Sequence, residues 1–230
     1  MTVAPLKLLS SMATRDVLAQ IIAGYERDTG RAVRAEAAGG VDVARRVAAG
    51  EAADVVILAR AAIDKLMQDG HLDPGSCVDL VESGIAVAVP AGRPKPDLRS
   101  EASLRHAVLT SRSVSYSTGP SGTYLRDLFE RWGILDRMRD RIVVPSPGVP
   151  VGELVARGAV DLGFQQSSEL SNVVGIDVAG PLPPEIQSLT TFSGAVSASS
   201  GQRAAARELL QFLAAPEAAD IKRRYGMDPA

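Results

Sequence analysis

Hydrophobic and polar positions along this chain follow two periods, one of two residues and one of about three and a half. Short apolar or alternating runs at 7–10, 32–37 and 54–58 are typical of strands. Apolar positions at helical spacing follow each run, and glycines end the first two helices at Gly30 and Gly50. The first third of the chain therefore predicts a βαβαβα order, a parallel sheet with right-handed crossovers.

The pattern changes near residues 81–84, and an apolar strand is predicted at 85–89. Further strands are predicted at 114–116, 142–144, 161–166 and 189–196. Ser167 or Ser168 could cap the turn after the third of these. Three prolines within 180–184 predict a bend rather than a strand.

Prolines near residues 94 and 181 lie close to where the chain could pass between two lobes. We expect lobe I to comprise residues 1–82 plus 189–230, and lobe II residues 83–188. Each lobe would be a mostly parallel sheet flanked by helices. The predicted class is α/β, with two lobes.

Composition excludes several kinds of protein. The 230 residues are 46% apolar and 23% charged with a net charge of −2, which argues against nucleic acid as a partner. With one cysteine and two histidines, we expect neither a cysteine-based nor a histidine-rich metal site. No apolar run reaches the length of a membrane span. No Gly-x-Ser-x-Gly, phosphate-loop lysine or dinucleotide fingerprint is present, so we expect no cofactor and no hydrolase, kinase or dehydrogenase. A monomer is expected.

One stretch, residues 114–126, predicts a strand, a tight turn and a helix whose first amides are unpaired. The partial positive charge of such a helix end suits a small anion. We expect Gly122 to let a ligand approach the backbone, and Ser121 or Thr123 to add a hydroxyl. The alternative is an ordinary turn with a serine cap.

Four such turns, each small, polar or glycine-rich, precede predicted helices. Because ligands collect where strand ends meet helix starts in open α/β sheets, we expect an anion site lined by these turns in both lobes. The candidate ligand-binding residues are Ser10, Ser11, Met12, Ala13, Gly39, Gly40, Val41, Ser121, Gly122, Thr123, Pro150, Val151, Gln165 and Gln166.

Two further features have two interpretations each. Gln165 and Gln166 end a strand expected to be buried; one amide could face the ligand, or both could satisfy buried loop backbone. Arginines in first or second helical turns could bind a carboxylate or simply be surface residues. These arginines are Arg15, Arg45, Arg46 and Arg126.

With these turns placed, the chain resembles the molybdate-binding-protein family of periplasmic solute-binding proteins over nearly its full length. The resemblance rests on the first strand and helix, Ala44-Arg45 to Asp54-Val-Val-Ile, Ser121-Gly-Thr-Tyr124, Val155-Ala-Arg-Gly158 to Asp161-Leu-Gly163, Ala215-Pro216 and Tyr225-Gly226. It implies a type II periplasmic-binding-protein fold, with an anion cleft between two α/β lobes, serving an ABC importer.

This sequence departs from that family at three ligand positions. Ala13 stands where the molybdate binders have a serine, the second serine position falls in Gly39-Gly40-Val41, and Gln166 replaces a tyrosine. The runs Gly163-Phe-Gln-Gln-Ser-Ser-Glu-Leu170, Gly180-Pro-Leu-Pro183 and Thr191-Phe-Ser193 are similar to a branch that includes aconitate isomerase. That likeness implies an organic polycarboxylate ligand.

Three functions remain open. The first is a solute-binding protein for a small anion, an organic di- or tricarboxylate in preference to molybdate, with an ABC transporter as partner. The second is an isomerase of the aconitate type, whose base would be Glu36, Asp42, Glu169 or Tyr116. The third is a cytoplasmic ligand sensor. The resemblance implies a periplasmic location, whereas residues 1–9 lack the pattern of a secretory signal and leave a cytoplasmic one open.

Overall fold

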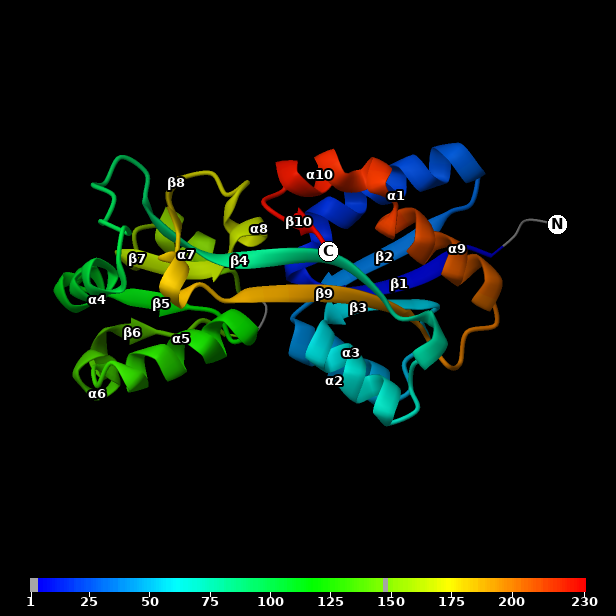
Figure 1. Ribbon diagram of the computed structural model, residues 1–230, viewed down its shortest axis with the longest axis horizontal. Coiled ribbons are helices and arrows are strands. Elements are labelled where there is room, and N and C mark those ends of the chain that lie inside the picture. Colours follow the sequence, from blue (N-terminus) through cyan, green and yellow to red (C-terminus); the bar gives the residue numbers. More distant parts are fainter. Residues whose placement is uncertain (1–3, 147–148) are drawn as a thin grey trace. The chain divides into compact units, whose positions relative to one another are not determined.

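The computed structural model describes residues 4–146 and 149–230, and the chain forms two compact units (Figure 1). Unit 1 comprises Met1–Glu82 with Thr191–Ala230, and unit 2 comprises Ser83–Thr190. Two strands continue across the boundaries, β4 (Val78–Pro90) and β9 (Leu189–Val196). Unit 1 is therefore built from two separate stretches of chain, and unit 2 from one.

The sheet of unit 1 has the order β2-β1-β3-β9-β4, with β10 paired to β4. β1 pairs in parallel with β2 and β3, whereas β9 is antiparallel to β3. Its strands besides β4 and β9 are β1 (Leu6–Ser11), β2 (Val33–Ala38), β3 (Val55–Ala59) and β10 (Asp228–Pro229). Its helices are η1 (Met12–Thr14), α1 (Arg15–Thr29), α2 (Gly40–Ala48), α3 (Arg60–Gln68), η2 (Pro74–Ser76), α9 (Arg203–Ala214), η5 (Pro216–Ala218) and α10 (Ala219–Arg224).

Alternation along the strands divides the core of unit 1 between two faces. Leu8 and Ile57 face α1, α9 and α10, while Leu9 and Val56 face α2 and α3 (Figure 1). A strand covered on both faces needs a continuous apolar run, which is what 54–58 provides. The predicted βαβαβα order is confirmed, and Gly30 ends α1 in the left-handed conformation at a φ of 69°.

The sheet of unit 2 has the order β8-β4-β7-β5-β6. β5 pairs in parallel with β6 and β7, and β4 is antiparallel to β7 and β8. Its strands besides β4 and β9 are β5 (Val114–Tyr116), β6 (Ile142–Val143), β7 (Leu162–Gln166) and β8 (Ile176–Pro181). Its helices are α4 (Glu101–Thr110), α5 (Pro120–Arg131), α6 (Leu135–Met138), η3 (Arg139–Arg141), α7 (Val151–Ala156), α8 (Ser167–Leu170) and η4 (Pro184–Ile186).

Three local predictions were wrong. The strand expected at 85–89 begins earlier, because β4 runs unbroken from Val78 to Pro90. The residues expected to cap a turn, Ser167 and Ser168, lie inside α8, whose N-cap residue is Gln166. The proline-rich bend is partly a strand: β8 extends to Pro181 and pairs with β4 at the sheet edge, where a missing proline N–H is tolerated.

Candidate functional site

In unit 1, two of the predicted turns meet at the carboxyl ends of β1 and β2. The parallel register places Ser10 opposite Ala37 and Ser11 opposite Ala38, so both strands end at one edge of the sheet. A β-carbon on Gly40 would lie 3.7 Å from that of Ser11, which brings the start of α2 beside the end of β1. Sequence positions thirty residues apart thus form one local surface.

Donors in this surface come from the backbone. Val43 N–H donates to Gly39 O in the first intrahelical bond of α2, and no side chain of the described residues caps that end. The amides before Val43, including those of Gly40 and Val41, are therefore available to an anion. Val41 is 71% exposed, so the start of α2 is accessible to solvent at this residue.

The η1 turn offers fewer groups than the sequence suggested. Thr14 Oγ1 donates to Ser11 O at 3.1 Å and lies 3.4 Å from Ser11 Oγ, so the two hydroxyls engage each other. Ala13 packs into the core of unit 1 together with Val17, and Met12 is half-buried. Ser10 is buried. Ser11 is buried too, so ligand contact by this turn would fall on its backbone amides.

In unit 2, the chain at Ser117 folds back over the first turn of α5. A β-carbon on Gly122 would lie 1.5 Å from Ser117 O, far closer than two atoms that are not bonded to each other can come. The carbonyl of Ser117 therefore requires glycine at this position, a reason that the sequence did not show, and close approach of a ligand to the Gly122 backbone stays a prediction. Ser121 Oγ lies 3.0 Å from Ser117 Oγ, and Gly119 N–H donates to the same hydroxyl.

Other predicted residues of unit 2 are placed less favourably. Thr123 is exposed, with its hydroxyl near Gly119 O at 3.4 Å. Pro150 is the half-buried N-cap residue of the short helix α7, and Val151 is fully buried in the core. The turn before them includes residues outside those described.

Both glutamines at the end of β7 are buried and hydrogen-bonded. Gln165 Oε1 accepts from Gly152 N–H at 3.3 Å, and its Nε2 donates to Glu169 Oε1 at 2.7 Å. The amide of Gln166 bonds with Thr190 Oγ1 at 2.9 Å, and with its oxygen and nitrogen exchanged it would also donate to Ser83 O. Gln165 thus links the start of α7 to an acid on α8, whereas Gln166 joins the segments where the chain enters and leaves unit 2.

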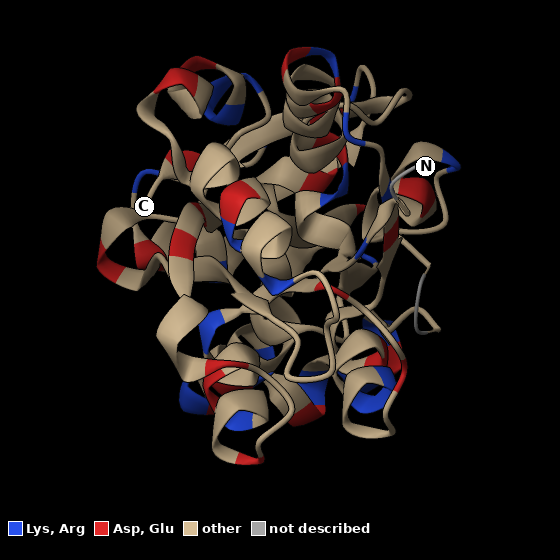
Figure 2. Ribbon diagram, turned by 90° about the vertical axis from the view of Figure 1, so that its right-hand side faces the viewer, with Lys and Arg blue, Asp and Glu red and all other residues tan. Residues whose placement is uncertain are grey.

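The four arginines considered for ligand binding all have carboxylate partners. Arg15 pairs with Asp16 and Arg126 with Asp127. Arg45 pairs with Asp42, while Arg46 contacts Glu36 and Glu51. Acidic and basic positions are interspersed along the chain in the same manner (Figure 2). These pairs favour the surface interpretation of the arginines.

The four candidate bases have different partners. Glu36 and Asp42 each pair with an arginine. Burial raises the pKa of Tyr116, so this phenol stays protonated at neutral pH. Glu169 Oε1 accepts a hydrogen bond from the amide of Gln165, and this bond orients the carboxylate.

The described residues contain neither a cluster of metal-binding side chains nor a helix that could cross a membrane. Among residues 4–146 and 149–230, no group of three or more His, Cys, Asp or Glu side chains could hold a metal ion. Within the same residues, no helix is long and apolar enough to cross a membrane. A hollow of about 710 Å³ in unit 2, lined by α4, Trp132 and Glu185 among others, contains none of the predicted site residues.

Sequence reasoning missed Lys222 on α10. Its side chain is 2% exposed, although it lies in a run of charged residues, Lys222-Arg-Arg224, that is typical of a solvated helix face. Helical spacing could have placed Lys222 beside Ala218 on the buried face of the helix. A lysine at such a position is unusual enough to be a signal.

Comparison with known proteins extends these observations. Residues 6–228 match the model of a family described as bacterial extracellular solute-binding protein. An aconitate isomerase from a Pseudomonas species is 39% identical over 99% of this chain and 88% of its own. A putative ABC transporter substrate-binding lipoprotein of Bacillus subtilis, YvgL, is 21% identical over 96% of this chain and 85% of its own.

A solved structure gives the fold. The periplasmic molybdate-binding protein of Azotobacter vinelandii superposes with a TM-score of 0.80 at 22% identity, covering 96% of this chain and 98% of that one. The predicted fold class is thereby confirmed as the type II periplasmic-binding-protein fold, and binding of a small solute follows from the family. This chain belongs to the family of bacterial extracellular solute-binding proteins.

Proposed function

We propose that this protein binds a small organic polycarboxylate of the aconitate class and interconverts its cis and trans isomers. The observation that carries the proposal is the 39% identity to an aconitate isomerase over 99% of the chain. The likeness to the transporter lipoprotein, at 21%, is much lower. We expect a periplasmic location from the family.

The turns described above suit this ligand class. The starts of α2 and α5 present backbone amides, and the Ser121 hydroxyl lies in the first turn of α5, 3.0 Å from Ser117 Oγ. Backbone amides at helix ends favour carboxylates as well as oxyanions. Of the residues predicted from the sequence, those we propose at the ligand are Gly40 and Val41 at the start of α2 and Ser121 and Gly122 at the start of α5.

The reaction needs neither redox chemistry nor a cofactor. A base removes a proton from the methylene carbon of aconitate, the electron pair moves into the allylic system, and a proton returns to the former vinylic carbon. The double bond shifts by one position, and the rotation of the intermediate decides which isomer forms. The protein must supply a base, a proton for return, and positive potential for the carboxylates that share the developing charge.

Glu169 is the residue we propose as the base. Gly152 N–H donates to Gln165 Oε1 and Gln165 Nε2 donates to Glu169 Oε1, and these two hydrogen bonds orient the carboxylate. A base oriented by a third group is the common arrangement in proton-transfer sites.

The test is proton NMR of trans-aconitate in deuterated buffer with the purified protein. We expect loss of the methylene signal by deuterium exchange and growth of the cis vinylic signal. Glu169→Gln should abolish both, with binding retained, whereas Glu153→Gln on the exposed face of α7 should leave the rates unchanged. Exchange at the wild-type rate in Glu169→Gln would remove Glu169 as the base.

A second candidate is capture of the same ligand for an ABC importer. The family match and the likeness to the Bacillus lipoprotein favour it. Titration calorimetry with trans-aconitate, beside the NMR experiment, separates the two. Binding without exchange supports capture, binding with exchange supports the isomerase, and no binding of aconitate, citrate or tricarballylate refutes both.

A further inference from the structure

The hollow in unit 2 has an aromatic wall that is held in place. Its volume is about 710 Å³, and its lining comes from α4, from the end of α5 and from η4. Trp132 Nε1 donates to Glu101 Oε1 at 2.5 Å, and the indole stacks on Phe129 with the ring centroids 5.6 Å apart. These two contacts fix the orientation of the indole. The part of the ring that Phe129 does not cover therefore forms an apolar wall, to which Ala102 and Leu109 add.

Two arginines line the same hollow. The guanidinium of Arg105 donates to Trp132 O at 3.1 Å, which places its charge beside the last turn of α5, where Arg131 lies. Among the described residues, neither arginine forms an ion pair with an acid. A guanidinium has five N–H donors, so most of those at Arg105 and all of those at Arg131 are not engaged by the described part of the chain. The hollow thus brings together two positive charges that an anion would bridge.

The two acids of the lining already accept hydrogen bonds from the protein. Glu101 Oε1 accepts from the indole, as described above, and Glu185 Oε1 accepts from the N–H of Glu101 at 2.7 Å. These carboxylates hold Trp132 and the start of α4 in place. The polar groups that the lining leaves for a ligand are therefore mainly donors, those of the two arginines and of His106.

This hollow is separate from the turn that we propose for aconitate. Ser121 lies in the first turn of α5 and Trp132 is its C-cap residue, at the other end of the helix. At a rise of 1.5 Å per residue, the two are about 16 Å apart along the helix. A six-carbon acid cannot span this distance, so a molecule in the hollow would be a second ligand.

We propose that the hollow is a second binding site of this protein, which takes a small aromatic carboxylate. The carboxylate would bridge the guanidinium groups of Arg105 and Arg131, which suit its planar geometry. The ring of the ligand would lie against the indole of Trp132, since aromatic pairs are more favourable than their buried area alone implies. This site goes beyond the proposed function and does not depend on it, because it uses none of the residues placed at aconitate.

The test uses the fluorescence of Trp132, which is the one tryptophan of the sequence and therefore reports on this hollow. The protein is titrated with benzoate, with benzyl alcohol as a ring without charge, and with inorganic phosphate as a charge without a ring. We expect a saturable change with benzoate at the lowest concentration. Arg105→Gln and Arg131→Gln should each weaken benzoate binding at least about tenfold, through loss of charge-assisted hydrogen bonds.

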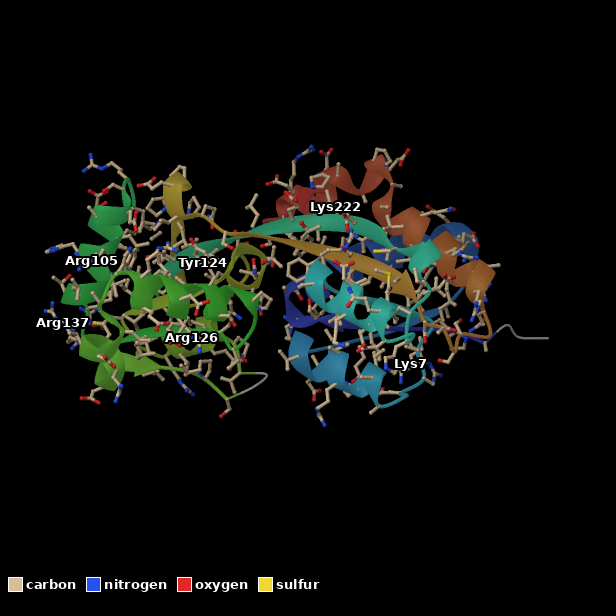
Figure 3. All side chains as sticks on the ribbon, turned by 60° about the horizontal axis from the view of Figure 1, so that its bottom comes forward. Lys7, Arg105, Tyr124, Arg126, Arg137 and Lys222 are labelled. Carbon is tan, nitrogen blue, oxygen red and sulfur yellow. The ribbon has the colours of Figure 1, made fainter. Side chains whose placement is uncertain are left out.

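The matched control is Arg137→Gln, which should bind benzoate as wild type does. Arg137 is an exposed arginine of α6 that lies toward the same end of unit 2 as Arg105 but is not part of the lining (Figure 3). Melting temperatures are measured for all variants. Should Arg105→Gln melt lower than wild type, because it loses the bond to Trp132 O, the result for Arg131→Gln decides.

Four outcomes overturn the proposal. No saturable change with benzoate would exclude the site, and equal benzoate affinity in wild type and Arg131→Gln would exclude the arginine bridge. Phosphate or benzyl alcohol binding as tightly as benzoate would refute the assigned ligand class. Weaker benzoate binding in Ser121→Ala, with displacement by trans-aconitate, would place benzoate at the start of α5 instead. The proposed function is judged separately, by calorimetry and NMR with trans-aconitate, and stands or fails without this site.

Discussion

Replacing Gly122 by alanine tests how the turn before α5 is built. The added β-carbon would lie 1.5 Å from Ser117 O and 2.6 Å from Ser117 C. Contacts below 3.0 Å do not occur for real β-carbons, so the Ser117 segment has to move by at least about 1.5 Å relative to the helix. Both partners are backbone, and no rotation of a side chain can relieve the contact.

The cost follows from what that movement breaks. The Ser117 hydroxyl contacts Ser121 Oγ and accepts from Gly119 N–H, and each such hydrogen bond contributes about 1 kcal/mol. Overpacking adds about 1–3 kcal/mol, while the better helix propensity of alanine returns up to about 1 kcal/mol. The free energy of unfolding should fall by about 3 kcal/mol, which lowers the melting temperature by roughly 6–12 °C for a chain of this size.

Urea denaturation followed by circular dichroism measures the change, with Gly119→Ala as the control in the same turn. At Gly119 the nearest atom to a β-carbon is Ser117 Oγ at 3.8 Å, and the backbone is extended at a φ of −86° and a ψ of −165°. The control should therefore cost no more than about 1 kcal/mol. A Gly122→Ala protein as stable as Gly119→Ala would refute the reasoning.

Three further predictions concern binding and pH. Ser121→Ala should weaken trans-aconitate binding about fivefold, through loss of one hydroxyl worth about 1 kcal/mol; unchanged affinity in calorimetry would exclude Ser121 from the ligand. The pKa of Lys222 is lower in the folded protein than in the unfolded chain, so stability should rise with pH toward about pH 10, and Lys222→Met should lose this rise in urea midpoints. Hydrogen bonds from Arg46, which has the larger effect, and from Lys7 lower the pKa of Glu51 from 4.5 to about 2. Its stabilisation should therefore be complete above pH 4.5 and lost as pH falls through about 2, and Glu51→Gln should show a weaker acid dependence; an identical acid profile would contradict this pairing.

Periodicity was sufficient for the fold but not for the atoms of the site. The strands at 54–58 and 189–196 and the helix ended by Gly30 follow from apolar spacing and glycine conformation, which are local properties. The contact between Gly122 and Ser117 depends on how the turn at 117–122 folds back, and the spacing of apolar residues carries no information about that. The same holds for Lys222, whose burial is decided by packing against α1. For the adjacent Gln165 and Gln166 the sequence left open whether one amide faces a ligand or both are satisfied internally, and both have hydrogen-bond partners inside unit 2.

The discontinuity of unit 1 has a consequence for synthesis on the ribosome. Residues 83–190 form one uninterrupted stretch, so unit 2 can fold as soon as it has left the exit tunnel. Strand β9 pairs with β3 in the middle of the unit 1 sheet, and α9 packs on α1, yet both come after residue 188 in the chain. The apolar faces of β1, β3 and α1 therefore stay uncovered until residues 191–230, which pack against them, have left the ribosome. During that interval they would be a natural target for chaperones.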